Sequence, residues 1–187
     1  MENKEKLRIQ IFDLVNKNFD MSQAIKIRAV TDNLGFFDAP ASTKYHGDYP
    51  GGLAEHSLQV ARNLMMLTKS LNLKWEDESS PILVGLLHDI CKCDLYKENP
   101  AWIEGSKEPR YLHRNDSIYS HHGEKSICML ASSLTMTEEE VACIRWHMGA
   151  YETDTNEWKY YGNAISKYPN VLWTHTADMM ASHINGV

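Results

Sequence analysis

The 187-residue sequence has few cysteines, and none of them forms a CxxC pair. This excludes a zinc ribbon, which needs paired cysteines at two places in the chain. The first residues are polar and include no apolar stretch of the kind found in secretory signals. We therefore expect reduced thiols and a cytoplasmic protein. The four cysteines are Cys91, Cys93, Cys128 and Cys143.

Long apolar runs and an excess of positive charge are also missing. No run approaches the roughly 18 apolar residues of a membrane-spanning helix, so we expect no membrane partner. The formal net charge of -6 disfavours long nucleic acids as partners, because their phosphate backbones attract basic surfaces. A small phosphorylated ligand is compatible with this charge, since a bound metal ion can invert the local field. A homo-oligomer stays an open alternative.

The sequence shows no alternating strand pattern, and its apolar residues recur instead at helical spacing. Pro81 suits the first turn of a helix, and Ser22 is a candidate cap for another. Two stretches rich in proline, glycine and polar residues, 35–52 and 93–120, are expected as long loops. The predicted helices cover residues 4–19, 21–33, 53–71, 82–90, 122–132, 138–147 and 168–182.

The composition is that of an ordinary globular domain, with 43% hydrophobic and 24% charged residues. A chain of this length can bury roughly 70% of the surface that its unfolded form exposes. We therefore predict an all-α fold, a single-domain helical bundle. Residues 1–50 would supply N-terminal helices and a loop that pack on the core, and residues 51–187 would form the functional part.

Nine histidines are many for this length, and several stand beside acidic residues or glycine. An isolated core histidine is usually satisfied by a carbonyl group and has no further role. Here five histidine-bearing segments occur together, and two of them also carry an aspartate within three positions. Mixed imidazole and carboxylate ligands suit Fe, Mn, Ni, Co or Zn rather than calcium. The segments contain His56, His88-Asp89, His121-His122, His147 and the His175/Asp178 pair.

The order of these residues resembles the H…HD…H…H…D pattern of the HD-domain metal-dependent phosphohydrolases. Residues 51–57 (GGLAEHS) look like the GGLLEHT segment of HD-type exoribonucleases, and residues 88–92 (HDICK) differ from the HDIGK form only at Cys91. A histidine before glycine, as in His122-Gly123, is similar to the related diadenosine tetraphosphate hydrolases and favours His122 over His121 as a ligand. The resemblance implies a helical HD domain that hydrolyses phosphate esters with one or two divalent transition-metal ions.

The resemblance also implies roles for individual residues. Asp89 would join two ions, and Lys92 would neutralise charge on the phosphoryl oxygens. A lysine at a helix C-terminus is also favoured by the helix dipole alone, so a purely solvated Lys92 is the competing interpretation. The implied metal ligands are His56, His88, Asp89, His122, His147 and Asp178.

Other residues are candidates for substrate contacts because of their chemistry. Basic or imidazole side chains that can bind phosphate are His121, Arg62, Lys125 and Arg114. Aromatic side chains that can stack on a base are Trp102, Tyr111, Tyr119, Tyr151 and Trp158. Trp146 and Trp173, on predicted helices, are expected to fill the core instead.

These features predict a phosphohydrolase that uses metal-activated water to cleave a phosphomonoester or phosphodiester. The expected partner is a small phosphorylated substrate, a nucleotide or a short oligonucleotide. The alternative is a non-catalytic metal- or nucleotide-binding sensor module with the same fold. The complete ligand series counts against it, because a module without turnover has no chemical need for these residues.

Overall fold

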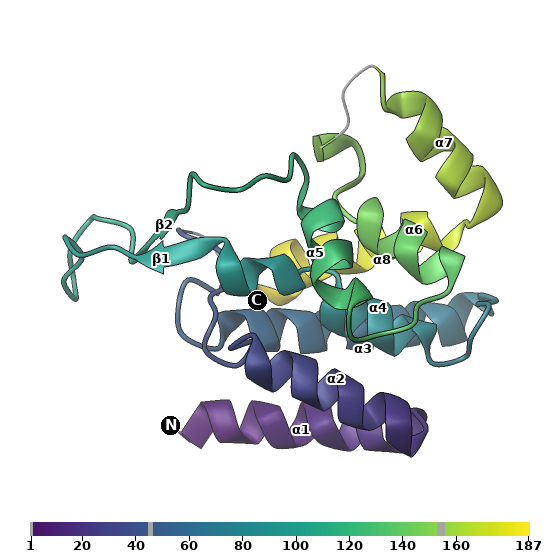
Figure 1. The fold of residues 1–187 in the computed structure, drawn as a ribbon, viewed down its shortest axis with the longest axis horizontal. Coiled ribbons are helices and arrows are strands. Elements are labelled where there is room, and N and C mark those ends of the chain that lie inside the picture. Colours follow the sequence, from purple (N-terminus) through teal and green to yellow (C-terminus); the bar gives the residue numbers. More distant parts are fainter. Residues whose placement is uncertain (1, 45–46, 153–155) are drawn as a thin grey trace.

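In the computed structural model, residues 2–44, 47–152 and 156–187 are described, and they fold into a helical bundle with one small hairpin (Figure 1). The all-α prediction is confirmed. None of the described helices is both long and apolar enough to cross a membrane. The α-helices are α1 (Glu2–Asn18), α2 (Met21–Asn33), α3 (Gly52–Leu71), α4 (Ser80–Leu87), α5 (His122–Ala131), α6 (Glu138–Arg145), α7 (Trp158–Lys167) and α8 (Asn170–Met180).

The first two helices pack together and form the lower layer in Figure 1, beneath α3. Ile11 and Val15 of α1 are fully buried against the rest of the core. A carboxylate oxygen of Asp20 accepts a hydrogen bond from the Gln23 N–H over 2.8 Å and so caps the start of α2. The prediction that Ser22 is the cap is therefore wrong, because the cap lies two residues earlier.

The centre of the bundle is the pair α3 and α4, which approach each other very closely at Gly85. A Cβ atom added to Gly85 would lie 2.4 Å from the Cα atom of Ala61 on α3. No side chain fits between backbones at that distance. Helix α8 packs against α3 and α6, and α5 packs against α6. These contacts place the histidine-bearing ends of several helices around one point.

The stretch expected as a second long loop contains a short hairpin. Strand β1 (Tyr96–Glu98) pairs antiparallel with β2 (Tyr111–His113), so that Tyr96 lies opposite His113 and Glu98 opposite Tyr111. Strands of three residues are too short to show an alternating pattern, which is why the sequence did not reveal them. The hairpin and the loop at its tip extend from one side of the bundle (Figure 1).

Several helix ends also differ from the prediction. Helix α4 ends at Leu87 and is followed by the 3-10 helix η1 (Ile90–Asp94), whereas one continuous helix to Ile90 was expected. Helix α7 was not predicted. The last expected helix begins later, at Asn170, and passes after Met180 into the π-helix η3 (Ala181–Asn185). Trp146 and Trp173 pack against the hydrophobic core, as expected.

Candidate metal centre

Five of the predicted ligand residues meet in the interior of the bundle. His56 comes from α3, His88 and Asp89 follow α4, His147 follows α6, and Asp178 lies on α8. All five are buried. Two groups have ligand atoms that lie within 4.8 Å of one another, His56 with His88 and Asp178, and His88 with Asp89 and His147. Because His88 belongs to both groups, they form one continuous cluster.

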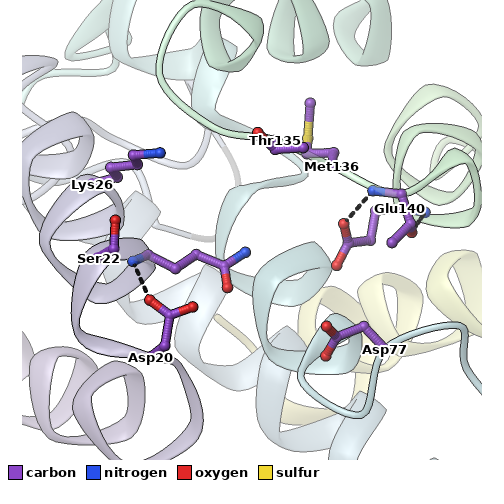
Figure 2. A pocket seen from close by; sticks show the side chains of 9 residues that line it. Asp20, Ser22, Lys26, Asp77, Thr135, Met136 and Glu140 are labelled. Atoms are coloured by element: carbon purple, nitrogen blue, oxygen red, sulfur yellow. Dashed lines mark hydrogen bonds between the residues drawn. The ribbon is translucent and has the colours of Figure 1, made fainter.

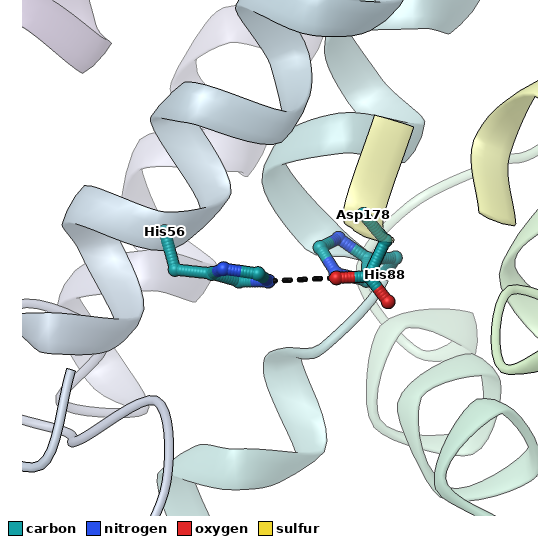
Figure 3. Close-up of side chains that lie close together, drawn as sticks. All are labelled: His56, His88 and Asp178. Atoms are coloured by element: carbon teal, nitrogen blue, oxygen red, sulfur yellow. Dashed lines mark ion pairs between the residues drawn. The ribbon is translucent and has the colours of Figure 1, made fainter. Parts of the chain in front are cut away.

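Three of these side chains are drawn in Figure 3. His56 and Asp178 point toward each other from different helices, with Nε2 of His56 3.1 Å from Oδ1 of Asp178. The Nε2 atom of His88 lies 3.9 Å from the same carboxylate oxygen. Residues far apart in the sequence therefore converge through their side-chain tips, which is the arrangement needed to surround one ion.

The histidines are held in the tautomer that a metal ligand requires. The Nδ1 atom of each ring lies at hydrogen-bonding distance from a main-chain oxygen: His56 from Val187 at 2.9 Å, His88 from Gly85 at 3.0 Å, and His147 from Ile144 at 2.8 Å. A carbonyl oxygen can only accept, so Nδ1 carries the proton and Nε2 keeps its lone pair. The three Nε2 lone pairs are therefore available for coordination.

Buried polar atoms in the cluster also point to a ligand. Within the described part of the chain, Nε2 of His88, Nε2 of His147 and Oδ1 of Asp89 make no hydrogen bond. Leaving a buried polar atom without a hydrogen bond costs roughly 1–3 kcal/mol. Metal coordination would satisfy all three atoms at once, so the donor set fits a divalent ion.

The carboxylate of Asp89 lies between the two groups of histidines. Its Oδ1 is 3.3 Å from Nε2 of His147, while its Oδ2 is 3.4 Å from Nε2 of His88. The ammonium of Lys92 lies 2.6 Å from Oδ2. Burial by itself would raise the pKa of Asp89, but Lys92 and then His88 hold it well below the usual range. Asp89 is therefore a carboxylate throughout the neutral pH range.

The surroundings shift the pKa values of the other cluster residues in different directions. Burial lowers the pKa of His88, although Asp89 opposes the shift. Burial also disfavours protonation of His147, yet the neighbouring carboxylate of Asp89 outweighs burial and raises the pKa of His147. For Asp178, burial is opposed by the neighbouring His56 and His88, and the pKa is lowered. The cluster thus keeps both carboxylates ionised in a dry interior.

The comparisons with known proteins agree with this geometry. The family model described as HD domain matches residues 53–172, which is more than half of the chain. The chain belongs to the HD-domain family. The search of curated proteins and the search of solved structures found no match. The predicted superfamily is confirmed, while the narrower resemblance to exoribonucleases and diadenosine tetraphosphate hydrolases gains no support.

HD domains bind divalent metals, and the family consists mostly of hydrolases. In this HD domain, four of the five clustered residues lie within the matched region, and Asp178 lies after it.

Asp178 is held in place by an amide side chain that the sequence did not indicate. Nδ2 of the buried Asn63 donates to the carbonyl oxygen of Ala177 over 3.0 Å and lies 3.1 Å from Oδ1 of Asn185.

The sixth predicted ligand, His122, lies at the start of α5 and is half-buried. It belongs to neither of the two ligand groups of the cluster and lines a neighbouring cavity with Cys91, His113 and Lys125. Its role as a ligand stays a prediction.

The thiol of Cys91 is fully buried, and burial, reinforced by Asp89, raises its pKa to about 12. Cys91 is therefore a neutral wall residue of this cavity.

The structure places the four predicted phosphate-binding residues in three different surroundings. Arg62 is exposed and donates to Gln10 of α1, so it points away from the cluster. Arg114 pairs with Asp94 and Asp116 at the surface. Neither residue adjoins the cluster, and for both the expected role in substrate binding lacks structural support.

Lys125 and His121 lie closer to the cluster, because both line the cavity beside Cys91. Lys125 is buried, with Nζ 3.0 Å from a carboxylate oxygen of Asp94. His121 forms an ion pair with Glu157 over 3.1 Å. Glu157 also pairs with Arg145, 2.9 Å away. Arg145 pairs with Glu124 as well, so the group of His121, Glu124 and Glu157 is an ion-pair network that already contains the guanidinium of Arg145 as its cation.

The predicted base-stacking residues are equally dispersed. Tyr111 is buried in the hairpin, whereas Trp158 is half-exposed on α7. The ring of Trp102 lies 4.7 Å from the guanidinium of Arg110. The side chain of Tyr151 lies outside the described part of the chain. Of those aromatics whose side chains are described, only Tyr111 lines a cavity that also includes Lys92.

Two further residues position the cluster without belonging to it. Nδ1 of His175 donates to the main-chain oxygen of His147 over 2.7 Å and so fixes the backbone of a ligand. Gly149 has a φ of 58°, and a Cβ there would lie 3.0 Å from Nδ1 of His175. The sequence indicated His175 only as a neighbour of Asp178, and no pattern predicts its contact with His147.

A second cavity, of about 380 Å³, lies away from the metal cluster and is drawn in Figure 2. The N-terminal ends of three helices surround it, and its wall includes Asp20, Asp77 and Glu140. Asp20 caps α2, Glu140 takes part in the capping box with Thr137 at the start of α6, and Asp77 accepts a hydrogen bond from Ser79 just before α4. The cavity therefore reflects helix packing, and its carboxylates are already engaged in local hydrogen bonds.

Proposed function

We propose that this protein is a metal-dependent phosphohydrolase acting on a small nucleotide or a short oligonucleotide. The proposal rests on one observation, a buried cluster whose carboxylate Asp89 forms an ion pair with Lys92. The cluster contains His56, His88, Asp89, His147 and Asp178. Family membership supports a hydrolase in general. The phosphate ester as substrate rests on the combination of carboxylate, imidazole and ammonium groups at one point.

Each residue has a distinct part in the proposed reaction. His56, His88 and Asp178 would hold one ion, and His147 would hold a second one together with Asp89, which has an oxygen facing each side. His122 is the further ligand proposed for the second ion. When bound, the metal supplies Lewis acidity that activates water and draws charge from the phosphoryl group.

The residues of the chain itself orient the substrate and handle its charge. The Lys92 ammonium lies where it can contact a phosphoryl oxygen, and such a contact strengthens as negative charge develops. In the hydrolysis, the oxygen of water forms a bond to phosphorus and the ester P–O bond breaks. The alcohol leaves with a proton that the water has lost. Burial of the cluster excludes bulk water and strengthens these electrostatic contacts.

The test combines metal analysis with a substrate screen. Purified protein is analysed for stoichiometric Fe, Mn, Ni, Co and Zn, and phosphate release is then measured with mononucleotides, cyclic nucleotides and short oligonucleotides in the presence of each ion. Asp89→Asn removes the charge of the shared ligand at nearly constant volume. We expect it to lower kcat/KM by at least about a thousandfold.

Activity that is unchanged in Asp89→Asn, or a protein that binds no metal, would disprove the proposal. The sensor module makes a different prediction. A nucleotide would then raise the melting temperature of the metal-loaded protein while no product forms over hours.

A further inference from the structure

A cavity of about 430 Å³ lies beside Lys92, between the N-terminal part of the chain and the hairpin. One wall includes Leu34, Asp38 and Pro40, and the opposite wall includes Tyr96, Glu98 and Tyr111. The first wall precedes residue 53, where the match to the HD-domain family begins. Half of the residues that line this cavity therefore come from a segment that the family model does not include.

Lys92 connects this cavity to the metal cluster. It lines the cavity, and its Nζ lies 2.6 Å from Oδ2 of Asp89. A phosphoryl group that contacts Lys92 at the cluster therefore has the rest of its molecule at the mouth of the cavity. This makes the cavity the natural place for the part of the substrate that is not hydrolysed.

The rings in the cavity wall are held in fixed positions. Tyr111 is 5% exposed, pairs with Glu98 across the hairpin, and has the guanidinium of Arg110 5.6 Å from its ring centre. Tyr96 makes an edge-to-face contact with His113, with ring centres 4.9 Å apart. Rings that are already ordered lose little entropy on binding, so they suit a flat apolar ligand.

The charges in the wall limit what such a ligand can carry. Apart from Lys92, whose charge is shared with Asp89, the cavity is lined by two carboxylates, Asp38 and Glu98, and one ammonium, Lys97. The carboxylate of Asp38 is already paired with the ammonium of Lys4, so the wall has no excess of positive charge that could hold a second phosphate group. Hydroxyl groups, in contrast, can donate hydrogen bonds to the carboxylates.

We propose that this cavity binds the uncharged, ring-bearing part of a substrate with one terminal phosphoryl group, the chemical class of nucleoside monophosphates. Asp38, Glu98 and Tyr96 determine this specificity. The inference rests on the proposed function, because the reaction occurs at the metal cluster. It adds that nucleoside diphosphates, dinucleoside polyphosphates and oligonucleotides are poor ligands.

The first experiment compares kcat/KM for adenosine and guanosine monophosphates with that for the diphosphates in metal-loaded protein. We expect a preference of at least about tenfold for the monophosphates, equivalent to roughly 1.4 kcal/mol. Glu98→Lys reverses one charge of the wall and should reduce this preference by about tenfold. Glu78→Lys is the matched control, because Glu78 is exposed and lies outside the cavity. It should leave the preference unchanged.

The second experiment tests the ring. Tyr96→Ala should raise KM for the monophosphates by about tenfold, within the range known for loss of one base–aromatic contact. The effect should fall on KM more than on kcat, because Tyr96 would contact the part of the substrate that does not react. Tyr96→Phe keeps the ring and should restore most of the affinity.

The outcomes separate the inference from the proposed function. If diphosphates or oligonucleotides are hydrolysed better than monophosphates, or if Tyr96→Ala leaves KM unchanged, the inference fails while the phosphohydrolase stands. If no substrate is hydrolysed with any metal, the proposed function fails. The inference is then decided by isothermal titration calorimetry with adenosine mono- and diphosphate, in which equal or tighter binding of the diphosphate overturns it.

Discussion

The ammonium of Lys92 lies 2.6 Å from Oδ2 of Asp89 in an interior where Asp89 is 2% exposed. Burial would lower the pKa of Lys92, but the carboxylates of Asp89 and Asp178 and the nearby Tyr96 raise it instead. The pair is therefore ionised at neutral pH. Lys92 neutralises a ligand of the cluster while remaining close enough to reach a substrate beside it.

Replacement of Lys92 by methionine should separate catalysis from metal binding. The Lys92→Met side chain has similar length without the charge, so we expect kcat to fall about a hundredfold to a thousandfold. The metal content should be kept or increased, because the ammonium no longer competes for Oδ2 of Asp89. Lys69→Met, on the exposed end of α3, is the control. Loss of metal from Lys92→Met would contradict this role.

Gly85→Ala should destabilise the bundle because the new Cβ would lie 2.4 Å from the backbone of Ala61. Overpacking of this kind costs about 1–3 kcal/mol, and the backbone on both sides leaves little room for relaxation. Denaturant unfolding measures the change. Gly162→Ala is the matched control, since nothing lies within 4 Å of a Cβ there. In α7 it should stabilise by up to about 1 kcal/mol.

Asn63→Leu should weaken metal binding indirectly, because Asn63 bonds to the main chain of the residue before the ligand Asp178. The variant loses the amide that donates to Ala177 O on α8. Loss of a supporting hydrogen bond of this kind lowers metal affinity by about tenfold to a hundredfold. Competition with a chelator provides the measurement. Thr174→Val, also buried on α8, loses a bond to Asn170 within its own helix and one with Cys143 of α6, and it should leave the affinity unchanged.

The contribution of Asp77 to stability should disappear in acid. Hydrogen bonds from the hydroxyl and N–H groups of Ser79 lower the pKa of Asp77. The ionised carboxylate therefore stabilises the start of α4 above its usual pKa near 3.8, and this contribution is lost as pH falls through the lowered folded-state pKa.

At pH 7 we expect Asp77→Ala to be less stable than the parent protein by about 1 kcal/mol, typical of the loss of a hydrogen bond. The difference should shrink steadily below about pH 4. Urea unfolding at several pH values gives both numbers. A difference that persists at pH 2 would show that Asp77 acts through packing rather than charge.

The ligand cluster was predictable where chemistry and chain order coincide. His88 and Asp89 are adjacent, which indicated a shared site, although the break after Leu87 that lets both reach the same interior point was not expected. Arg62 shows the limit of such reasoning. Its charge made it a candidate, but its position on α3 directs it to Gln10 of α1. Only the packing of α1 reveals this.

The fold was predictable to the extent that apolar spacing defines helices. Helix α2 matches the expected range, whereas α7 and the hairpin were missed. Helix α7 was missed although Trp158, Tyr161 and Ile165 recur at helical spacing, and of this apolar stripe only Tyr161 is buried. The contacts of Gly85 and Asn63 depend on the crossing of two helices, and single-sequence patterns carry no information on such crossings.

The five clustered side chains come from α3, α8 and the segments after α4 and α6, so an ion bound among them would crosslink elements distributed over most of the chain. Folding and metal uptake are then thermodynamically linked. At a free metal concentration 100 times the Kd, the native state gains about 2.7 kcal/mol. The melting temperature of this protein is therefore expected to rise with the metal content of the buffer, even without substrate.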